Sequence, residues 1–300
     1  MNPDFNFADI DIFCARGILD NFFRLMSGGG KGTRLIRVVC QLIGSTLIVK
    51  QKAPLPDVHF AGPRHGLGLG VEFERAFTDA EPPIPGNSLH IRTLLYQLGH
   101  LKCVVNVEVD AFDPVDEASD TPATHQLNPS AKQLIEEKPL AGDLSVVRSG
   151  YIIDSSQLRE IKTSLFNGSH NIHTKTKTSE HAAQAFFSSI LRELVGLHTA
   201  GRNTFKWLKE IDRPEGISDW AYNQRINLQL VVSLLVRLRL ATHRSKHGVC
   251  VAMCLPGFKK HMKIYEPEFD KVKLNLELTP SVYRIPKTLI PQEYVNLFWR

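Results

Sequence analysis

The stretch that decides the fold class is residues 103–110, Cys-Val-Val-Asn-Val-Glu-Val-Asp. Its valines alternate with Asn106, Glu108 and Asp110, and this period of two residues predicts a β-strand with one apolar face and one acidic face. Side chains two positions apart on a strand point the same way and lie roughly 6.6 Å apart, so Glu108 and Asp110 project together. Two carboxylates placed in this way offer hard oxygen ligands to a cation.

A second strand-like stretch, residues 158–165, repeats this geometry with a carboxylate and an amine. We expect it to form a hairpin with residues 151–153, in which Glu160 and Lys162 share the polar face. A sheet in which this hairpin lies next to the valine-rich strand brings both side chains to Asp110.

Such a group suits metal-assisted hydrolysis of a phosphodiester. Mg²⁺ or Mn²⁺ takes carboxylates together with waters and phosphate oxygens, so Asp110 and Glu160 are expected ligands. Glu108 is a further ligand or the position for a second ion. Lys162 would orient the attacking water and offset the negative charge that develops at phosphorus.

Spacing alone supports this interpretation only weakly. With 31 acidic residues in 300, an acid-x-Lys triplet is expected roughly twice by chance, and the chain contains two. The other copy, residues 136–138, is followed by Pro139, which disfavours a central strand. The alternative from pattern alone is that Glu160 and Lys162 form a solvated cross-strand pair and that the acidic side chains of residues 103–110 line an exposed edge.

The composition is that of a globular protein, with 43% apolar and 22% charged residues. A chain of this size buries enough surface to need no disulfide or structural metal. We expect a single domain over residues 1–300, with a polar insertion at 113–142 and a C-terminal segment that wraps the domain from about residue 265. The net charge of +5 is spread along the chain, so it permits a nucleic-acid partner without arguing for one.

Three features predict an intracellular protein, cytoplasmic or nuclear. The five cysteines are an odd number that forms no disulfide framework, which favours a reducing compartment. The first eleven residues carry acidic side chains and no basic-then-apolar signal region. The longest apolar run, residues 228–240, is interrupted by polar side chains and is shorter than the roughly 20 residues that a membrane span needs.

Hydrophobic periodicity predicts helices and strands around the two decisive stretches, and hence a mixed α/β class. The expected strands are a hairpin at 35–49 that turns at Gly44-Ser45, and single strands at 195–198, 204–208 and 249–255. The expected helices lie at 11–26, 88–98, 180–194 and 220–240, with a Pro- and Gly-rich loop at 54–70.

Four blocks of the chain resemble successive blocks of one protein group. They read Leu-Gly-His-Leu-Lys-Cys-Val-Val-Asn-Val-Glu-Val-Asp-Ala-Phe at 98–112, Tyr-Ile-Ile-Asp-Ser-Ser-Gln-Leu-Arg-Glu-Ile-Lys-Thr-Ser at 151–164, Ala-Gln-Ala-Phe-Phe at 183–187 and Gly-Leu-His-Thr-Ala-Gly-Arg-Asn-Thr-Phe at 196–205. The chain looks like a member of a fungal group with a PD-(D/E)XK nuclease-like fold, often labelled geranylgeranyl pyrophosphate synthetase-like. The group is remotely similar to the exonucleases that remove faulty RNA caps. The resemblance covers most of residues 5–210.

The resemblance implies a restriction-endonuclease-like central mixed sheet flanked by helices. It further implies a metal-dependent nuclease or phosphodiesterase that hydrolyses DNA or RNA with Mg²⁺ or Mn²⁺. Asp110 and Glu160 match the metal-ligand positions of that fold family, and Lys162 matches its catalytic lysine. Gln184 matches a position that often carries a substrate- or water-orienting glutamine.

The chain also departs from the family pattern. Val109 precedes Asp110 where the family has proline, 49 residues (111–159) separate Asp110 from Glu160, and Ser188 stands where an aromatic residue often follows. These departures leave room for a second function class, a catalytically silent nuclease fold kept as a binding or accessory protein, encoded beside a biosynthetic or defence locus.

Several other motifs are set aside. A prenyl-diphosphate synthase needs paired aspartates on facing helices, and residues 113–117 lack them. The glycine-rich residues 28–33 run from a helix to a strand, whereas a phosphate loop runs from a strand to a helix. Packed or solvated side chains are the default for the residues that invite a zinc or thiol interpretation, which are Cys14, His170, His173, His181, His198, Cys250 and Cys254.

Overall fold

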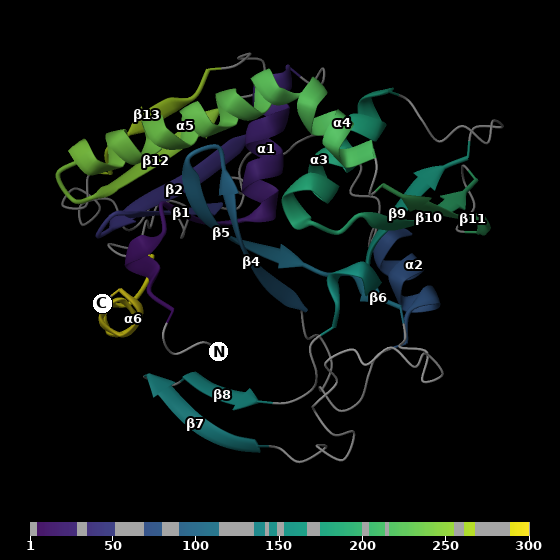
Figure 1. Ribbon diagram of the computed structural model, residues 1–300, viewed down its shortest axis with the longest axis horizontal. Coiled ribbons are helices and arrows are strands. Elements are labelled where there is room, and N and C mark those ends of the chain that lie inside the picture. The colour runs from purple at the N-terminus through teal and green to yellow at the C-terminus, as the bar shows by residue number, and fades with distance from the viewer. Residues whose placement is uncertain are drawn as a thin grey trace, which may run out of the picture.

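The computed structural model describes residues 5–28, 35–51, 69–79, 90–113, 135–141, 144–148, 153–166, 175–199, 204–213, 216–254, 261–267 and 289–299. The fold is mixed α/β: a large mixed sheet flanked by helices, with a smaller sheet at one end of the molecule (Figure 1).

The large sheet has seven strands in the order β13-β12-β2-β3-β1-β5-β4. The strands are β1 (Ile12–Ala15), β2 (Ile36–Ile43), β3 (Thr46–Gln51), β4 (Ile91–Leu98), β5 (Leu101–Glu108), β12 (Val249–Cys254) and β13 (Lys263–Tyr265). β1 runs parallel to both β3 and β5, whereas the other neighbours are antiparallel. β2 and β3 form the expected hairpin, and Gly44 at its turn has φ 55°, which favours glycine.

The small sheet has the order β11-β10-β9-β6. Its strands are β6 (Ala111–Phe112), β9 (Leu158–Leu165), β10 (Arg192–His198) and β11 (Phe205–Asp212). β9 and β10 are parallel and are joined by the crossover helix α3 (Lys175–Ser188), while β11 and β6 pair antiparallel. The two sheets are joined covalently where the chain leaves β5 and enters β6. A separate two-stranded sheet consists of β7 (Ile135–Ala141) and β8 (Leu144–Arg148).

Helices α1 (Arg16–Ser27) and α5 (Arg225–Arg244) pack against each other and on one face of the large sheet (Figure 1). Apolar residues of α1, among them Ile18, Leu19 and Phe22, are at most 2% exposed and form the main core with the strands. Gly28 ends α1 in the left-handed conformation at φ 73°. Burial of this apolar layer is the main force that holds helices and sheet together.

The remaining helices are shorter than α1, α3 and α5. They are α2 (Leu69–Phe77), α4 (Gly216–Asn223), α6 (Gln292–Phe298) and the 3-10 turns η1 (Phe7–Asp9) and η2 (Ser155–Gln157). α2 packs on β9, and the ring of Phe73 lies directly over Gly196 of β10. All five cysteines are buried, and none of them forms a disulfide. Among the described helices, none combines the length and the apolar character needed to cross a membrane.

The helix expected at 180–194 ends with α3 at Ser188, and its last three residues belong to β10. Three other expected elements are wrong. The helix expected at 88–98 is the edge strand β4, because Leu94, Tyr96 and Leu98 pack inward beside β5 while the residues between them stay outside. The first residues of the helix expected at 11–26 form β1, which is held between two partner strands rather than by local preference.

The hairpin expected at 151–165 is the third. Its second strand is β9, but Ile153 lies in no strand, residues 151 and 152 lie outside the described residues, and β9 pairs with β6 and β10 instead. Part of the polar insertion expected at 113–142 is strand β7, which contains Pro139. A two-stranded sheet tolerates this proline because each strand has one unpaired side.

The C-terminal segment contacts the N-terminal part of the fold. Trp299 donates a hydrogen bond from Nε1 to Thr46 Oγ1 at 2.9 Å, and its ring stacks on Phe7 at 4.8 Å between centroids. Most of the tail expected to wrap the domain, residues 268–288, lies outside the described residues. The single-domain boundary of 1–300 stays a prediction.

Candidate functional site

Asp110 lies at the junction between the two sheets. The Val109 N–H still bonds the His90 carbonyl at 2.9 Å beside the large sheet, and two residues later Ala111 pairs with Arg159 in the small one. Asp110 Oδ2 accepts a hydrogen bond of 2.8 Å from the backbone N–H of Ile161. Since β6 is only two residues long, the Asp110 side chain accepts the hydrogen bond from β9 that a backbone carbonyl of a longer strand would accept.

Glu160 and Lys162 project from the same face of β9, next to this bond. Glu160 is 4% exposed, and the Lys162 ammonium donates to its Oε1. The guanidinium of Arg16, at the start of α1, lies 3.5 Å from the same oxygen. The other oxygen, Oε2, is buried and has no hydrogen-bond partner among the described residues. The convergence of Asp110, Glu160 and Lys162 therefore comes about through β6–β9 pairing.

Helix α1 adds a second buried acid to this group. Arg16 contacts Asp20 one turn along the helix at 3.5 Å, and the Asp20 side chain is only 7% exposed. Burial raises the pKa of Asp20 to about 6, although Arg16 and Arg24 oppose this, and Glu160 raises it further. Arg16 therefore links two carboxylates from different elements.

Burial also raises the pKa of Asp110 to about 6, and the neighbouring carboxylate of Glu160 adds to the shift. The hydrogen bond from Ile161 and the ammonium of Lys162 act in the opposite direction. The carboxylates of Asp110 and Glu160 are therefore close enough to share one cation, since a cation would remove their repulsion.

Glu74 on α2 is a member of the group that the sequence patterns did not indicate. Its pKa is raised by burial and by the carboxylates of Glu108 and Glu160, while Lys162 lowers it. Phe73, which is fully buried, fixes the helix on the small sheet and so places its neighbour Glu74 near the site. No local spacing could have indicated this proximity, because it arises from packing of α2 on β9. The spacing of four residues between Arg16 and Asp20 indicates an ion pair along α1, but it does not indicate that this pair lies beside Glu160.

Glu108 and Gln184 lie less centrally. Glu108 ends β5 with an exposed side chain, and its one effect on the group is the raised pKa of Glu74. Gln184 lies on α3, one helical turn after Glu180, which pairs with Arg24 of α1 at 3.9 Å. Its Oε1 atom is buried without a hydrogen-bond partner among the described residues.

A separate buried acid is fully partnered. Glu193 of β10, the register neighbour of Glu160, accepts hydrogen bonds from Arg213 at 2.8 Å and contacts His181 of α3 at 3.2 Å. Burial alone would raise its pKa, but these two partners hold it below the usual range. Of the histidines considered for zinc, His181 contacts Glu193, His198 lies beside Phe205, and residues 170 and 173 lie outside the described residues.

The donor set suits a hard divalent cation, but it is not assembled as a ligand cage. Within the described residues, no three His, Cys, Asp or Glu side chains are grouped as a metal site. Lys162 and Arg16 instead neutralise Glu160. The residues nevertheless fit a cation chemically, because the group offers carboxylate oxygens, and the buried Oε2 of Glu160 has a lone pair with no partner in the described structure.

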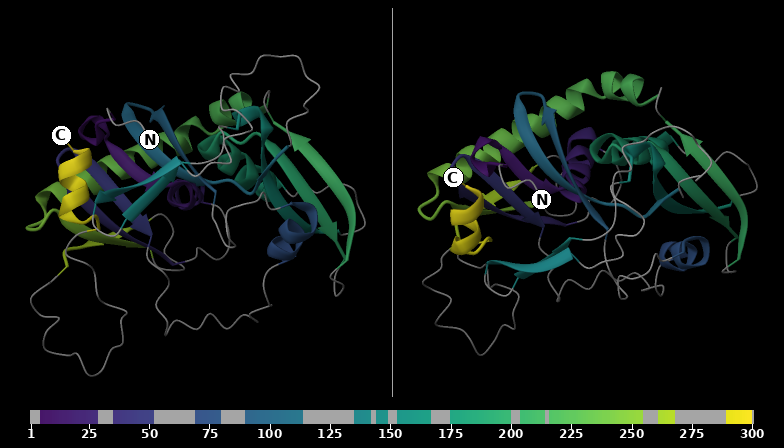
Figure 2. Two further views of the ribbon diagram at one scale, coloured as in Figure 1. Left: turned by 90° about the horizontal axis from the view of Figure 1, so that it is seen from below. Right: turned by 60° about the horizontal axis from the view of Figure 1, so that its bottom comes forward.

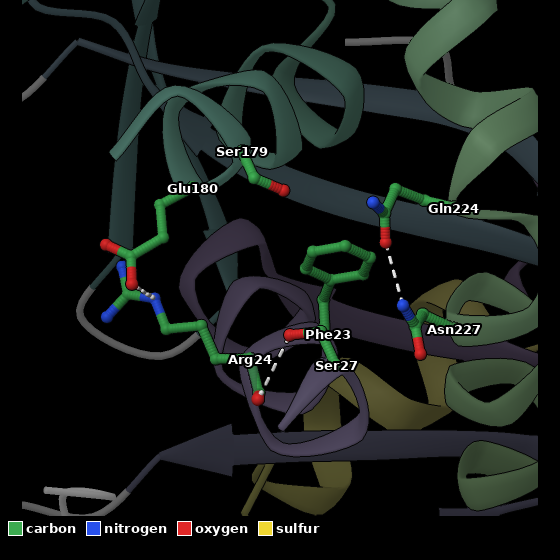
Figure 3. Close-up of a pocket in the computed structure, with 7 residues that line it drawn as sticks. All are labelled: Phe23, Arg24, Ser27, Ser179, Glu180, Gln224 and Asn227. Carbon is green, nitrogen blue, oxygen red and sulfur yellow. Dashed lines mark hydrogen bonds and ion pairs between the residues drawn. The ribbon is translucent and has the colours of Figure 1, made fainter. Parts of the chain in front are cut away.

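A cavity of about 260 Å³ lies one turn along α1 from Asp20, between α1, α3 and the start of α5 (Figure 3). Its wall includes the Arg24–Glu180 ion pair and the hydrogen bond that Asn227 donates to Gln224. None of the acids of the candidate site lines it. The cavity is therefore distinct from the site at the sheet junction.

Solved structures with a similar fold belong to the Rai1 and Dxo1 proteins. Scheffersomyces stipitis Rai1 in complex with (3'-NADP)+ and calcium matches with TM-score 0.56 and 12% identity, over 88% of this chain and 69% of that one. K. lactis Dxo1 in complex with manganese matches with TM-score 0.52 and 10% identity, over 89% and 67%. S. pombe Rai1 in complex with 3'-FADP matches with TM-score 0.51 and 12% identity, over 84% and 70%.

The chain thus has the α/β fold of these proteins, and at such low identity the likeness concerns the fold alone. A family model described as "Domain of unknown function (DUF8563)" matches residues 1–278, and the chain belongs to this family. No curated protein matches it. The label of a geranylgeranyl pyrophosphate synthetase-like group has no support among these matches.

Proposed function

We propose that this protein is a divalent-metal-dependent phosphodiesterase that acts on RNA ends. The observation that carries the proposal is the meeting of Asp110, Glu160 and Lys162 at the sheet junction, with one buried Glu160 oxygen that has no partner among the described residues. The fold neighbours add weight, because the Rai1 and Dxo1 structures hold nucleotide ligands, calcium or manganese.

The carboxylates of the site would bind the cation, and the Lys162 ammonium would offset negative charge on the substrate. Asp110 and Glu160 would supply the first carboxylate oxygens, and Glu74 and Glu108 would supply further ones from the neighbouring elements. When bound, Mg²⁺ or Mn²⁺ lowers the pKa of a coordinated water and polarises a phosphoryl oxygen. Lys162 would orient an attacking water and stabilise the negative charge that develops on the phosphate. Gln184, with its unpartnered amide oxygen, orients the water or the substrate.

Arg16 completes the electrostatics of this arrangement. It lies 3.5 Å from both Glu160 and Asp20, so it keeps two buried carboxylates from repelling each other when the cation is absent. The Arg16 guanidinium, beside Glu160, would also offer paired N–H donors to a phosphate bound at the site.

The second candidate is a silent nuclease fold that binds nucleic acid without cleaving it. The observation that favours it is the absence, within the described residues, of an assembled three-ligand group. The two candidates differ in metal uptake, since a silent module has no need of a cation at Glu160.

The test uses the purified chain with 5'-labelled single-stranded RNA, double-stranded RNA and the matching DNA, each with Mn²⁺ or Mg²⁺. Asp110→Asn, Glu160→Gln and Lys162→Met should each lower the cleavage rate at least about 100-fold, the usual effect of a removed charge-stabilising or acid–base group. Glu210→Gln is the matched control, because this acid lies on the opposite face of the same sheet, paired with Arg159.

Calorimetry with Mn²⁺ separates the two candidates. The enzyme predicts uptake that is lost in Glu160→Gln and kept in Glu210→Gln. Cleavage that is absent with both ions, or that persists unchanged in the three variants, would remove the enzymatic proposal. Nucleic-acid binding without metal uptake would then favour the silent module.

A further inference from the structure

The outermost strand of the small sheet, β11, carries an aromatic and basic surface on the same face as Glu160 and Lys162. Strand register defines this face, because paired residues on neighbouring strands point to the same side. Lys209 of β11 pairs with Val195, which pairs with Lys162. One row further on, Trp207 pairs with Leu197, which pairs with Ser164 of β9. Strand spacing of about 4.8 Å puts Lys209 roughly 10 Å from Lys162 across the sheet.

The side chains of this surface have the character of a base-stacking site. Trp207 is 39% exposed, although it is a large aromatic residue. Phe166, just after β9, packs on its ring with 4.2 Å between centroids, and the ammonium of Lys206 lies 5.7 Å from the ring centroid. Lys206 is the extra residue of the irregular pairing between β10 and β11, so it can lie beside Trp207 rather than opposite it. We call Phe166, Lys206, Trp207 and Lys209 the β11 platform.

The charges of β11 are sorted by face. Both lysines belong to the platform, whereas Glu210 and Asp212 point to the opposite face, where Glu210 pairs with Arg159 at 3.6 Å. A strand with aromatic and cationic groups on one side and acids on the other is complementary to a polyanion that carries flat apolar rings. Single-stranded nucleic acid has this chemistry: its bases stack on aromatic rings, and its phosphates meet lysines.

We propose that the β11 platform binds a single-stranded segment of nucleic acid at the outer edge of the small sheet. This inference rests on the proposed function for its ligand class, because it takes nucleic acid as the substrate of the junction site. Figure 2 shows β11 at the outer edge of the small sheet, away from the helices that cover the large one, where a strand can approach. The platform would contact bases by stacking rather than by hydrogen bonds to their edges, so we expect binding without nucleotide-sequence preference.

The test measures binding of a fluorescein-labelled, mixed-sequence RNA of roughly a dozen nucleotides to the full chain in EDTA, by fluorescence anisotropy. Trp207→Ala should weaken binding about 5- to 150-fold, which corresponds to the loss of one stacked base. Trp207→Phe keeps a ring and should retain most of the affinity. Leu208→Ala is the matched control, because Leu208 is 51% exposed on the opposite face of the same strand. Lys209→Ala should reduce the slope of log Kd against log salt by about one.

A fluorescence measurement keeps the test valid if Trp207→Ala does not fold. The chain has three tryptophans, and RNA should quench the emission of the wild-type chain but not that of Trp207→Phe. Equal affinities of Trp207→Ala and Leu208→Ala, or equal quenching in wild type and Trp207→Phe, would overturn the platform.

Hydrolysis of a small diester, bis(p-nitrophenyl) phosphate with Mn²⁺, separates the two proposals. Trp207→Ala should hydrolyse it at the wild-type rate, because the compound is too short to reach β11. If the wild-type chain shows no hydrolysis but Trp207→Ala loses RNA affinity, the enzymatic proposal fails and the platform stands. If hydrolysis is intact and the RNA affinity of Trp207→Ala is unchanged, only the platform fails.

Discussion

Gly196→Ala tests whether α2 is fixed in place by its contact with the small sheet. A Cβ atom at Gly196 would lie 2.4, 2.7 and 2.8 Å from three ring atoms of Phe73, whereas ordinary contacts begin at 3.4 Å, so the ring would have to retreat by about 1 Å. Phe73 is fully buried and is packed against Phe77 and Phe205 with centroids 4.4 and 4.7 Å away. Overpacking of this kind lowers the free energy of unfolding by about 1–3 kcal/mol.

The assay is urea unfolding followed by circular dichroism, with the midpoint and slope compared between variants. Gly17→Ala is the control, because a Cβ there meets nothing within 4 Å and alanine favours the helix by up to about 1 kcal/mol. Phe73→Leu should relieve the clash, so the double variant should be more stable than the sum of the single losses by at least about 0.5 kcal/mol.

The same substitution has a consequence for the site. Glu74 follows Phe73 directly on α2, so a helix displaced by about 1 Å carries this carboxylate away from Glu160. We expect Gly196→Ala to weaken Mn²⁺ uptake while Gly17→Ala leaves it unchanged. Stability within about 0.5 kcal/mol of wild type, or strictly additive effects with Phe73→Leu, would refute the packing argument.

Three further outcomes follow from the buried charges. The pKa of Asp20 is about 6 in the fold against an ordinary 3.8, so the stability that its protonated form contributes is fully present below pH 3.8 and is lost as the pH rises through 6. Asp20→Asn should therefore be more stable than wild type by up to about 3 kcal/mol at pH 8 and equal to it near pH 3.5, as judged by urea midpoints. Arg213→Met leaves Glu193 buried with one partner fewer and should destabilise by about 3–5 kcal/mol in the same assay, and a loss below 1 kcal/mol would show that water reaches this acid. Binding of Mn²⁺ should raise the thermal midpoint of wild type, and EDTA should reverse it, whereas Glu160→Gln should show no shift with either addition.

The fold could be predicted where a strand or helix carries its own pattern. The alternation in 103–110 identifies β5, and the β-branched runs around Gly44-Ser45 identify the β2–β3 hairpin, because each of these strands buries one face against the core. β4 lacked such a signal: its outward side carries Ile91 and Leu95, which are 54% and 52% exposed, so its apolar residues do not separate onto one face of a strand. Only pairing with β5 makes it a strand.

The candidate site, like the fold, could be predicted only where its residues follow a local pattern. The carboxylates and the lysine were visible from their spacing, since i and i+2 positions on a strand share a face. Their assembly was not, because the expected hairpin with residues 151–153 is replaced by pairing of β9 with a two-residue strand that follows Asp110. Glu74 and Asp20 come from helices that reach the group by packing, and no spacing within either helix encodes that contact.

The short length of β6 explains why chemistry and fold meet at Asp110. A longer strand would have satisfied the Ile161 N–H with a backbone carbonyl and covered the edge of β9 beside Glu160. Because β6 begins only at Ala111, the Asp110 carboxylate accepts that hydrogen bond, and burial together with Glu160 raises the pKa of the same carboxylate. Oδ2 of Asp110 thus accepts the hydrogen bond that continues the pairing of β6 with β9, while the negative charge of the same carboxylate contributes to the candidate site. The junction between the sheets therefore requires an acceptor side chain at residue 110 for structure, and only an acid there serves both the ladder and a cation.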